Sequence, residues 1–226
     1  MSKGVGRAQN RVGHHGSVRR LPLDKVRSRP ARAFAALSVV AVLAVSSAEA
    51  ANPSLADQLR GGGVILVIRH AATDQSKPDQ DPVNLKDCGT QRNLSALGRN
   101  DARRIGQGVR RLRLRIGAVL SSPFCRTLET ARLAFGRANV SLTLLNTIVA
   151  DHDAAWRSQI RAARRLFGAK PAAGRITVLV THGSVVGDAT GLSLEEGEAL
   201  VFRPHGASRF RLLGRILPRG WATLGP

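Results

Sequence analysis

The sequence predicts an α/β fold, a three-layer α/β/α sandwich with a mainly parallel central sheet. Continuous aliphatic runs typical of buried strands alternate with amphipathic segments typical of helices. No repeat or low-complexity tract interrupts residues 51–226, which have the length of one domain. Parallel strands end at the same edge of a sheet, and ligands bind at that edge in such folds, so the functional residues are expected there.

The first predicted elements are a short helix and a strand that is buried on both faces. Residues 54–62, SLADQLRGG, have a serine at the helix start and glycines at its end. Residues 63–70, GVILVIRH, form an unbroken aliphatic run bounded by glycine, which is typical of a central strand. Residues 74–93 are polar and rich in turn-forming residues, and they predict a loop or a lid.

A second helix, a strand and a third helix are predicted after this loop. Residues 93–112 have helical spacing of apolar side chains. Their apolar face should carry Leu97, Ile105, Val109 and Leu112. Residues 116–123, IGAVLSSP, predict an apolar strand that closes on a turn, and residues 125–135, CRTLETARLAF, predict a helix.

The remaining chain continues the alternation. Residues 140–149, VSLTLLNTIV, predict a strand, and residues 154–168, AAWRSQIRAARRLFG, predict an amphipathic helix. Residues 175–183, RITVLVTHG, predict a third buried strand that runs into a loop. Two closing strands are expected at residues 197–204 and 209–216.

The first 50 residues have the organisation of a secretory signal peptide. Residues 1–32 contain nine Lys or Arg against one acid, and residues 33–48 form an uncharged stretch of 16 residues. The Ala-Glu-Ala that follows fits signal peptidase, so we expect cleavage after Ala50. A membrane anchor or a buried helix is the alternative, although a spanning helix needs about 20 apolar residues. The pair Arg19-Arg20 leaves both the general and the twin-arginine export routes open.

The charge of the chain indicates an anionic partner. The formal net charge is +20, and residues 1–50 hold nine basic and two acidic residues, which leaves +13 for residues 51–226. Such a field attracts phosphorylated substrates, nucleic acid or a phosphate-bearing envelope surface. Nucleic-acid binders interleave aromatic and basic residues, whereas this chain has no Tyr and two Trp. A specific nucleic-acid partner is therefore not expected.

Cys88 and Cys125 are the two cysteines of the chain. In an oxidising compartment they could pair. The alternative is that they are two separate small residues near a core, because cysteine is among the most often buried residue types. The sequence leaves both possibilities open.

Three predicted strand ends deliver nitrogen-bearing side chains to the same edge of the sheet. Arg69 and His70 end the first strand, Arg126 follows the second, and His182 follows the third. Guanidinium groups suit phosphate oxygens, and an imidazole can act as a neutral nucleophile or a cationic stabiliser. A metal site fits poorly, because the arginines would repel a divalent ion and no acid lies at metal-site spacing. The set suits a phosphoryl group, with one ring attacking phosphorus and the other three groups holding its equatorial oxygens.

Four segments in this order, VIRHAAT, NLSALGRNDA, LSSPFCRTLETA and VLVTHG, resemble the histidine phosphatase superfamily, which has the phosphoglycerate-mutase-like fold. The resemblance covers most of residues 61–187. Only 55 residues separate Arg126 from His182, so a small member without a large cap domain is implied. The family has a glycine after Arg-His where this chain has Ala71, and the extra methyl group could narrow access to the phosphate.

The resemblance implies a role for each of these side chains. His70 would become phosphorylated, Arg69 and Arg126 would grip the phosphoryl oxygens, and His182 would donate a further hydrogen bond to the transition state. Thr73 lies where the family often has Thr or Ser near the phosphate, so it would bind substrate. Capping of a loop is the alternative role for Thr73.

The proton donor for the leaving group is the least defined part of the site. Relatives of the phytase type have an Asp directly after the second catalytic His, where this chain has Gly183. Mutase-like relatives have an acid after the strand that follows the second arginine motif, and Asp151 is the preferred match. Asp151 could instead cap the helix that follows it. Further candidates are Asp153, Asp188, Glu195 and Glu196.

Together these features predict an exported, periplasmic or secreted phosphoric monoester hydrolase that uses no metal or organic cofactor. Its substrate would be a small phosphorylated molecule, such as a sugar phosphate, or a phosphate displayed on the cell envelope. No lasting membrane span is expected after signal cleavage, and the oligomeric state stays open. A noncatalytic phosphate-binding envelope protein on the same fold and a phosphomutase are the alternatives.

Overall fold

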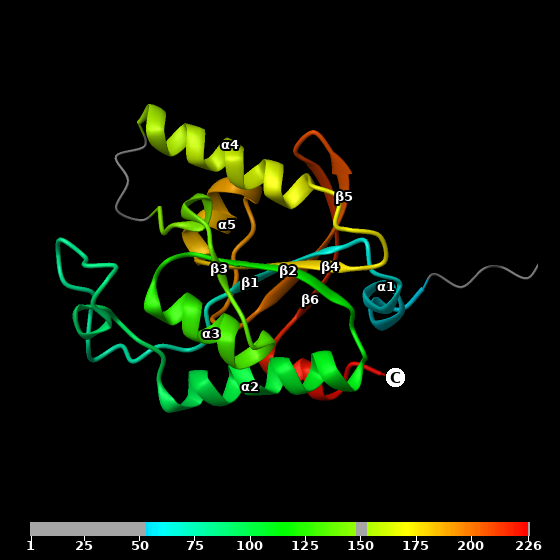
Figure 1. Cartoon of the computed structure of the whole chain (residues 1–226), viewed down its shortest axis with the longest axis horizontal. Coiled ribbons are helices and arrows are strands. Elements are labelled where there is room, and N and C mark those ends of the chain that lie inside the picture. The colour runs from blue at the N-terminus through cyan, green and yellow to red at the C-terminus, as the bar shows by residue number, and fades with distance from the viewer. Residues whose placement is uncertain (1–52, 148–152, 226) are drawn as a thin grey trace, which may run out of the picture. The chain divides into compact units, whose positions relative to one another are not determined.

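A mixed sheet of six strands forms the centre of the computed structural model, which describes residues 53–147 and 153–225 (Figure 1). The strand order is β3-β2-β4-β1-β5-β6. The strands are β1 (Ile65–Arg69), β2 (Ile116–Ser121), β3 (Asn139–Val140), β4 (Ile176–Thr181), β5 (Ala199–Gly206) and β6 (Arg209–Ile216). The first four are parallel to one another, and β5 runs antiparallel to both of its neighbours, so the expected mainly parallel sheet is confirmed.

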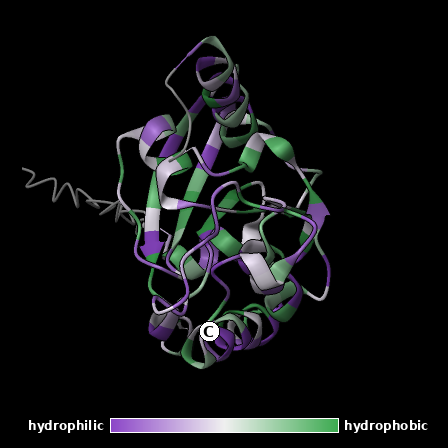
Figure 2. Ribbon diagram, turned by 90° about the vertical axis from the view of Figure 1, so that its left-hand side faces the viewer, coloured by the Kyte–Doolittle hydropathy of each residue, from purple (hydrophilic) through white to green (hydrophobic). Residues whose placement is uncertain are grey.

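Helices cover both faces of the sheet, which confirms the predicted three layers (Figure 1). One face carries α1 (Leu55–Gly61), α2 (Ala96–Arg111), α3 (Cys125–Phe135) and the 3₁₀ helix η3 (Pro218–Ala222). The other face carries α4 (Ala154–Gly168) and α5 (Gly183–Thr190). Hydrophobic residues are concentrated in the strands between these layers (Figure 2).

The aliphatic run of β1 is unbroken because each of its faces packs against a different helical layer. Leu66 and Ile68 belong to the apolar cluster beneath α2 and α3, whereas Ile65 and Val67 belong to the cluster beneath α4 and α5. All four side chains are completely buried. Successive side chains of a strand point to opposite faces, so a central strand of a covered sheet needs an apolar residue at every position.

Serine caps start the first two helices, and the cap at Ser54 is the one that the sequence predicts. The Ser54 hydroxyl accepts from the Asp57 N–H at 3.1 Å, and the Ser95 hydroxyl accepts from the Gly98 N–H at 3.0 Å. Gly98 also allows a close approach, because a Cβ there would lie 1.9 Å from the Ala72 carbonyl oxygen. The loop that follows β1 therefore passes directly over the first turn of α2.

The strand predicted at residues 140–149 and the buried position predicted for Leu97 are both wrong. The strand expected at residues 140–149 is limited to the two residues of β3, and the chain then turns through the 3₁₀ helix η2 (Leu142–Leu144). This turn buries Leu144 in the cluster beneath α4 and α5. Residues 148 and 149 lie outside the described ranges. Leu97, expected on the apolar face of α2, is 59 % exposed. It lies eight residues before Ile105, and this spacing places it about 80° away from Ile105 around the helix axis.

The loop expected after the third buried strand is the helix α5. Its first residue follows His182, and it ends at Gly191, whose φ of 75° is in the left-handed region that glycine adopts readily. Its Val185 and Val186 side chains are completely buried against the sheet. The burial of this short apolar face stabilises a helix that is too short to be recognised from its pattern alone.

The polar loop expected at residues 74–93 is present, and a disulfide between Cys88 and Cys125 ties it to the start of α3. The loop contains the 3₁₀ helix η1 (Cys88–Thr90). The buried Gln91 side chain adds a second link, because it donates to the Asn84 carbonyl at 2.8 Å and accepts from the Cys125 N–H at 2.9 Å. A cross-link over 37 residues stabilises a fold by roughly 3–4 kcal/mol through the unfolded chain.

The described chain between Arg126 and His182 consists of α3, β3, η2, α4 and β4, which are elements of the sandwich itself. Within the two described ranges, no helix has the length and apolar character needed to cross a bilayer.

Candidate active site

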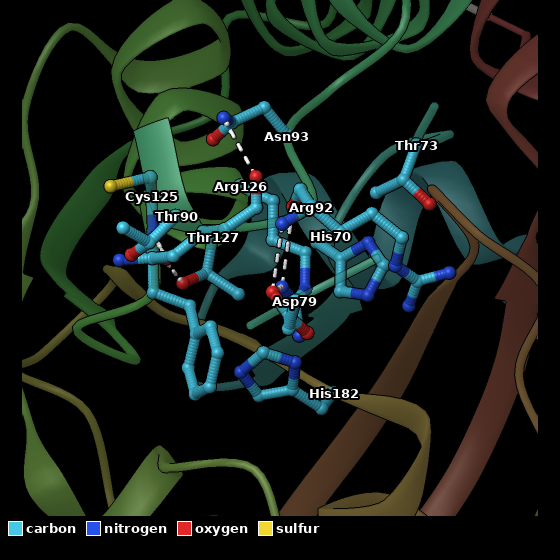
Figure 3. A network of polar contacts seen from close by, with 12 residues as sticks. His70, Thr73, Asp79, Thr90, Arg92, Asn93, Cys125, Arg126, Thr127 and His182 are labelled. Carbon is cyan, nitrogen blue, oxygen red and sulfur yellow. Dashed lines mark hydrogen bonds and ion pairs between the residues drawn. The ribbon is translucent and has the colours of Figure 1, made fainter. Parts of the chain in front are cut away.

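Strand pairing brings two histidines together at the carboxyl edge of the sheet. β1 and β4 are parallel neighbours, with Arg69 opposite Thr181. The His70 N–H donates to the Thr181 carbonyl at 2.9 Å, and the ring centroids of His70 and His182 lie 5.4 Å apart in an edge-to-face arrangement. Arg126, in the first turn of α3, reaches the same place (Figure 3).

The His70 ring is buried and held in one tautomer. Its Nδ1 lies 3.0 Å from the Ala71 carbonyl oxygen, which can only accept, so Nδ1 carries the hydrogen and Nε2 keeps its lone pair. Burial, together with the positive charges of Arg126 and Arg69, lowers the pKa of His70 to about 3. The ring is therefore neutral at physiological pH, with Nε2 available as a nucleophile.

His182 is equally buried and has one nitrogen without a partner. Its Nε2 lies 2.9 Å from the Ser122 hydroxyl, and its Nδ1 makes no hydrogen bond. Burial holds the pKa of His182 well below its usual range, and nearby positive charge adds to the effect. When Ser122 donates to Nε2, the Nδ1–H of His182 is a donor for an incoming oxygen.

Arg126 is a completely buried guanidinium with partners on several sides. Its Nη1 donates to Asp79 Oδ1 at 2.9 Å and to the Arg92 carbonyl at 3.2 Å, and its charged end lies 4.3 Å from the centre of the Phe124 ring. Burial lowers the pKa of Arg126, and the hydrogen bond that Arg126 donates to Asp79 opposes this change. The carboxylate and the ring face offset part of the cost of burying the charge.

Arg69 is held on the other side of His70. Its Nη1 donates to the Leu194 carbonyl at 2.8 Å, and its Nη2 lies 3.5 Å from Glu196 Oε1. Glu196 is also 3.9 Å from His70 Nδ1. The carboxylate thus lies at the edge of the imidazole away from Nε2, where it stabilises positive charge on the ring without blocking attack.

Three unpartnered polar atoms mark the site as a place for a ligand. Among the described residues, four buried side-chain polar atoms have no hydrogen-bond partner: Arg69 Nε, Arg126 Nε, His182 Nδ1 and Trp221 Nε1. The first three belong to side chains that line one cavity of about 290 Å³. Buried N–H groups are costly to leave unpaired, so a ligand with several acceptor oxygens fits here.

The cavity also contains residues that the sequence analysis did not single out. Its lining consists of Arg69, His70, Arg92, Arg126, Asn146, His182, Gly183, Ser184, Ser193 and Leu194. Arg92 is the third guanidinium of the site, and it directly precedes the NLSALGRNDA segment. This adjacency is the only signal for Arg92 in the sequence. A turn-rich loop has no periodicity that would show which way a side chain points.

Comparison with known families agrees with this geometry. Residues 65–149 match the family model described as histidine phosphatase superfamily (branch 1). The match covers 85 of the 226 residues, and this part of the chain is similar to the histidine phosphatase superfamily. The matched region contains Arg69, His70 and Arg126, and His182 lies beyond it, at the end of the strand that pairs with β1.

Solved structures match this chain at low sequence identity. A phosphoserine phosphatase mutant from Entamoeba histolytica in complex with phosphoserine is 14% identical, with a TM-score of 0.47 over 67% of this chain and 95% of that one. The protein histidine phosphatase SixA complexed with tungstate is 16% identical, with a TM-score of 0.48 over 69% of this chain and 97% of that one. None of the curated proteins shows a significant sequence match to this chain.

Thr73, expected beside the phosphate, contacts Glu196. Its hydroxyl donates to Glu196 Oε1 at 2.7 Å, and its N–H lies 3.1 Å from Oε2. Thr73 is not among the residues that line the cavity. In this arrangement it orients the carboxylate behind Arg69, and its contact with substrate stays a prediction.

The candidate proton donors occupy different places. Asp151, the preferred residue, lies outside the described ranges. Asp153 caps α4, where its Oδ1 accepts from the Trp156 N–H at 2.8 Å, which is the alternative role that the sequence left open. Asp188 Oδ2 accepts from the Thr147 hydroxyl at 2.7 Å. Neither these two carboxylates nor those of Glu195 and Glu196 line the cavity.

In the part of the chain that the structure describes, no three His, Cys, Asp or Glu side chains are clustered as a metal site requires.

Acid should destabilise this protein partly through His70. Below pH 6.5 the unfolded chain protonates this ring, whereas the folded protein does not until pH 3 is approached, so folding stability falls as the pH falls. The loss should be about 1.4 kcal/mol per pH unit between pH 6 and 4. Urea unfolding of the protein and of His70→Gln at several pH values measures it, and the variant should have the shallower dependence.

The matched control is His205→Gln, which replaces an exposed histidine on β5. It should leave the pH dependence unchanged. Equal slopes for His70→Gln and the unmodified protein would show that His70 is charged in the folded state, against this description of the site.

Proposed function

We propose that this chain is an exported phosphatase that hydrolyses phosphomonoesters through a phosphohistidine intermediate on His70. A sugar phosphate or an envelope-associated phosphate would be the substrate. The observation that carries the proposal is a neutral imidazole with a free Nε2 beside three unpartnered N–H groups in one cavity. This combination provides a nucleophile and the donors for a phosphoryl group that passes through a trigonal transition state.

In the first step, His70 Nε2 attacks phosphorus and the bond to the leaving oxygen breaks. The leaving oxygen departs with the bonding electron pair and takes a proton from an acid, for which Asp151 is the proposed donor. Arg69 Nε, Arg126 Nε and His182 Nδ1 each donate to an equatorial oxygen as charge builds up there.

In the second step, water attacks the phosphorus of phosphohistidine and returns a proton to the carboxylate left on the proposed donor, Asp151. The bond between phosphorus and Nε2 breaks, its electron pair returns to the ring, and inorganic phosphate leaves. Because burial and the arginines favour the neutral ring, His70 is a good leaving group in this step. Neither step requires a metal or an organic cofactor.

Export to the periplasm or the medium is part of the proposal. The basic and apolar leader of residues 1–50, with cleavage after Ala50, supports it. The disulfide between Cys88 and Cys125 adds independent support, since such bonds persist in oxidising compartments.

Hydrolysis of para-nitrophenyl phosphate tests the catalytic part of the proposal. The protein should release phosphate between pH 4 and 8, and His70→Ala should lower kcat at least about 10³-fold, because the covalent route is lost. Rapid alkaline quenching should trap one acid-labile phosphoryl group on His70, detected by mass spectrometry. Addition of a chelator should leave the rate unchanged.

The control variant is Arg103→Gln, which removes one exposed charge from α2 and should retain turnover. Equal, negligible turnover by the protein and by His70→Ala, with phosphate still bound, would replace the enzyme with a noncatalytic phosphate-binding protein. Loss of activity on chelation would instead indicate a metal-dependent hydrolase.

The export proposal is tested by expression of the full chain with a carboxyl-terminal tag in a Gram-negative host. The tagged protein should fractionate with the periplasm or medium, begin at Ala51 on amino-terminal sequencing, and contain no free thiol. Recovery from the cytoplasm with residues 1–50 attached and both thiols reduced would contradict export.

A further inference from the structure

A third guanidinium lines the cavity beside the proposed reaction centre. Arg92 borders the same cavity of about 290 Å³ as the two histidines. Arg126 is completely buried, whereas Arg92 is half-buried and so lies nearer to the solvent side of the cavity. Arg92 is therefore placed to meet a part of the substrate outside the pocket for the transferred phosphoryl group.

The backbone of Arg92 is fixed to the reaction centre. Its N–H donates to Asp79 Oδ1 at 2.8 Å, and its carbonyl accepts from Arg126 Nη1 at 3.2 Å (Figure 3). The preceding residue, Gln91, bonds to the start of α3, and the disulfide of Cys88 ties the same loop to that helix. Because the loop is already fixed, binding of a ligand by this side chain does not require the backbone to be ordered first.

The charge of Arg92 is also uncompensated, in contrast to the other two arginines. Arg69 pairs with Glu196 at 3.5 Å, and Arg126 pairs with Asp79 at 2.9 Å. The Arg92 side chain donates to the uncharged amide of Gln75, with Nη1 2.6 Å from Oε1. Within the described ranges, no carboxylate oxygen lies close enough to the Arg92 guanidinium nitrogens for an ion pair, for which the limit is 4.0 Å.

The field of this charge reaches the centre of the site. Arg92 is among the causes that lower the pKa of His70 and of His182, after burial and the nearer charges. A substrate that carries only one phosphoryl group would leave this cation without a partner, because Arg69, Arg126 and His182 already provide a donor for each equatorial oxygen.

We propose that Arg92 binds a second anionic group of the substrate, a carboxylate or a second phosphate within a few bonds of the transferred phosphoryl group. The inference rests on the proposed phosphatase function and narrows its substrate class. A planar guanidinium held by the Gln75 amide can bind either anion through two parallel N–H donors. Phosphates of uncharged alcohols would then be poorer ligands than acidic phosphomonoesters of the same size.

Isothermal titration calorimetry with three two-carbon ligands tests this inference. They are 2-hydroxyethyl phosphate, phosphoglycolate and ethylene glycol bisphosphate, which differ in having a hydroxyl group, a carboxylate or a phosphate at the second position. Binding is measured on His70→Ala, which cannot turn them over. Phosphoglycolate and the bisphosphate should bind at least about tenfold tighter than the hydroxyl compound, as expected for a charged hydrogen-bonded pair.

When Arg92→Gln is added to the His70→Ala variant, the affinities for the three ligands should lie within about twofold of one another. Arg92→Lys, which keeps the charge without the two parallel donors, should retain part of the preference and serves if the glutamine variant unfolds. The matched control is Arg103→Gln, which removes one exposed charge from α2 and should leave the preference intact.

Two results would overturn the inference. Equal affinities for the three ligands when Arg92 is present would show that the cation binds no second anion. Equal weakening of all three by Arg92→Gln would show that Arg92 grips the transferred phosphoryl group itself. Both results come from binding alone. The proposed phosphatase function is tested independently, by the hydrolysis of para-nitrophenyl phosphate.

Discussion

The in-register parallel pairing of β1 with β4 is the constraint on which the site depends. It places Arg69 opposite Thr181, so that the residue following each strand is a histidine at the same edge of the sheet. A shift of one residue would turn every side chain of β1 to the opposite face and separate the two rings. The two apolar clusters that bury opposite faces of β1 prevent such a shift. The packing of the core thus determines the chemistry at its edge.

Electrostatics at this edge is arranged before a ligand arrives. The two buried imidazoles are held neutral, while Arg126 and Arg69 keep their charge with a carboxylate behind each. Donors fixed by the fold need no reorganisation when charge develops on a phosphoryl group, which is the main advantage of a protein site over water. The cost is a set of buried N–H groups without partners in the free protein, and a phosphoryl ligand relieves that cost.

The sequence predicts most of the sheet and the four central side chains for a common physical reason. A strand that is buried on both faces must be aliphatic at every position, so Arg69, His70 and His182 stand out where such runs end. The helix starts at Ser54 and Ser95 follow from local capping chemistry. These signals are local, and a single sequence is enough to read them.

Features that depend on long-range contacts could not be predicted in this way. Arg92 and Asp79 reach the site because a disulfide and the buried Gln91 fix the path of their loop, and no spacing reveals that path. Leu144 suits a strand by propensity, but its burial beneath α4 turns the chain into a 3₁₀ helix. Helix α5 is short, and only its packing on the sheet stabilises it.

The central claim, that one phosphoryl group is held by these side chains with His70 as nucleophile, is tested most directly by a crystal structure of the protein with vanadate. Vanadium takes the trigonal bipyramidal geometry of phosphorus during transfer. The account predicts a bond from vanadium to His70 Nε2, with equatorial oxygens within hydrogen-bond distance of Arg69, Arg126 and His182. Vanadate bound through another residue, or a cavity without vanadate at a saturating concentration, would contradict it.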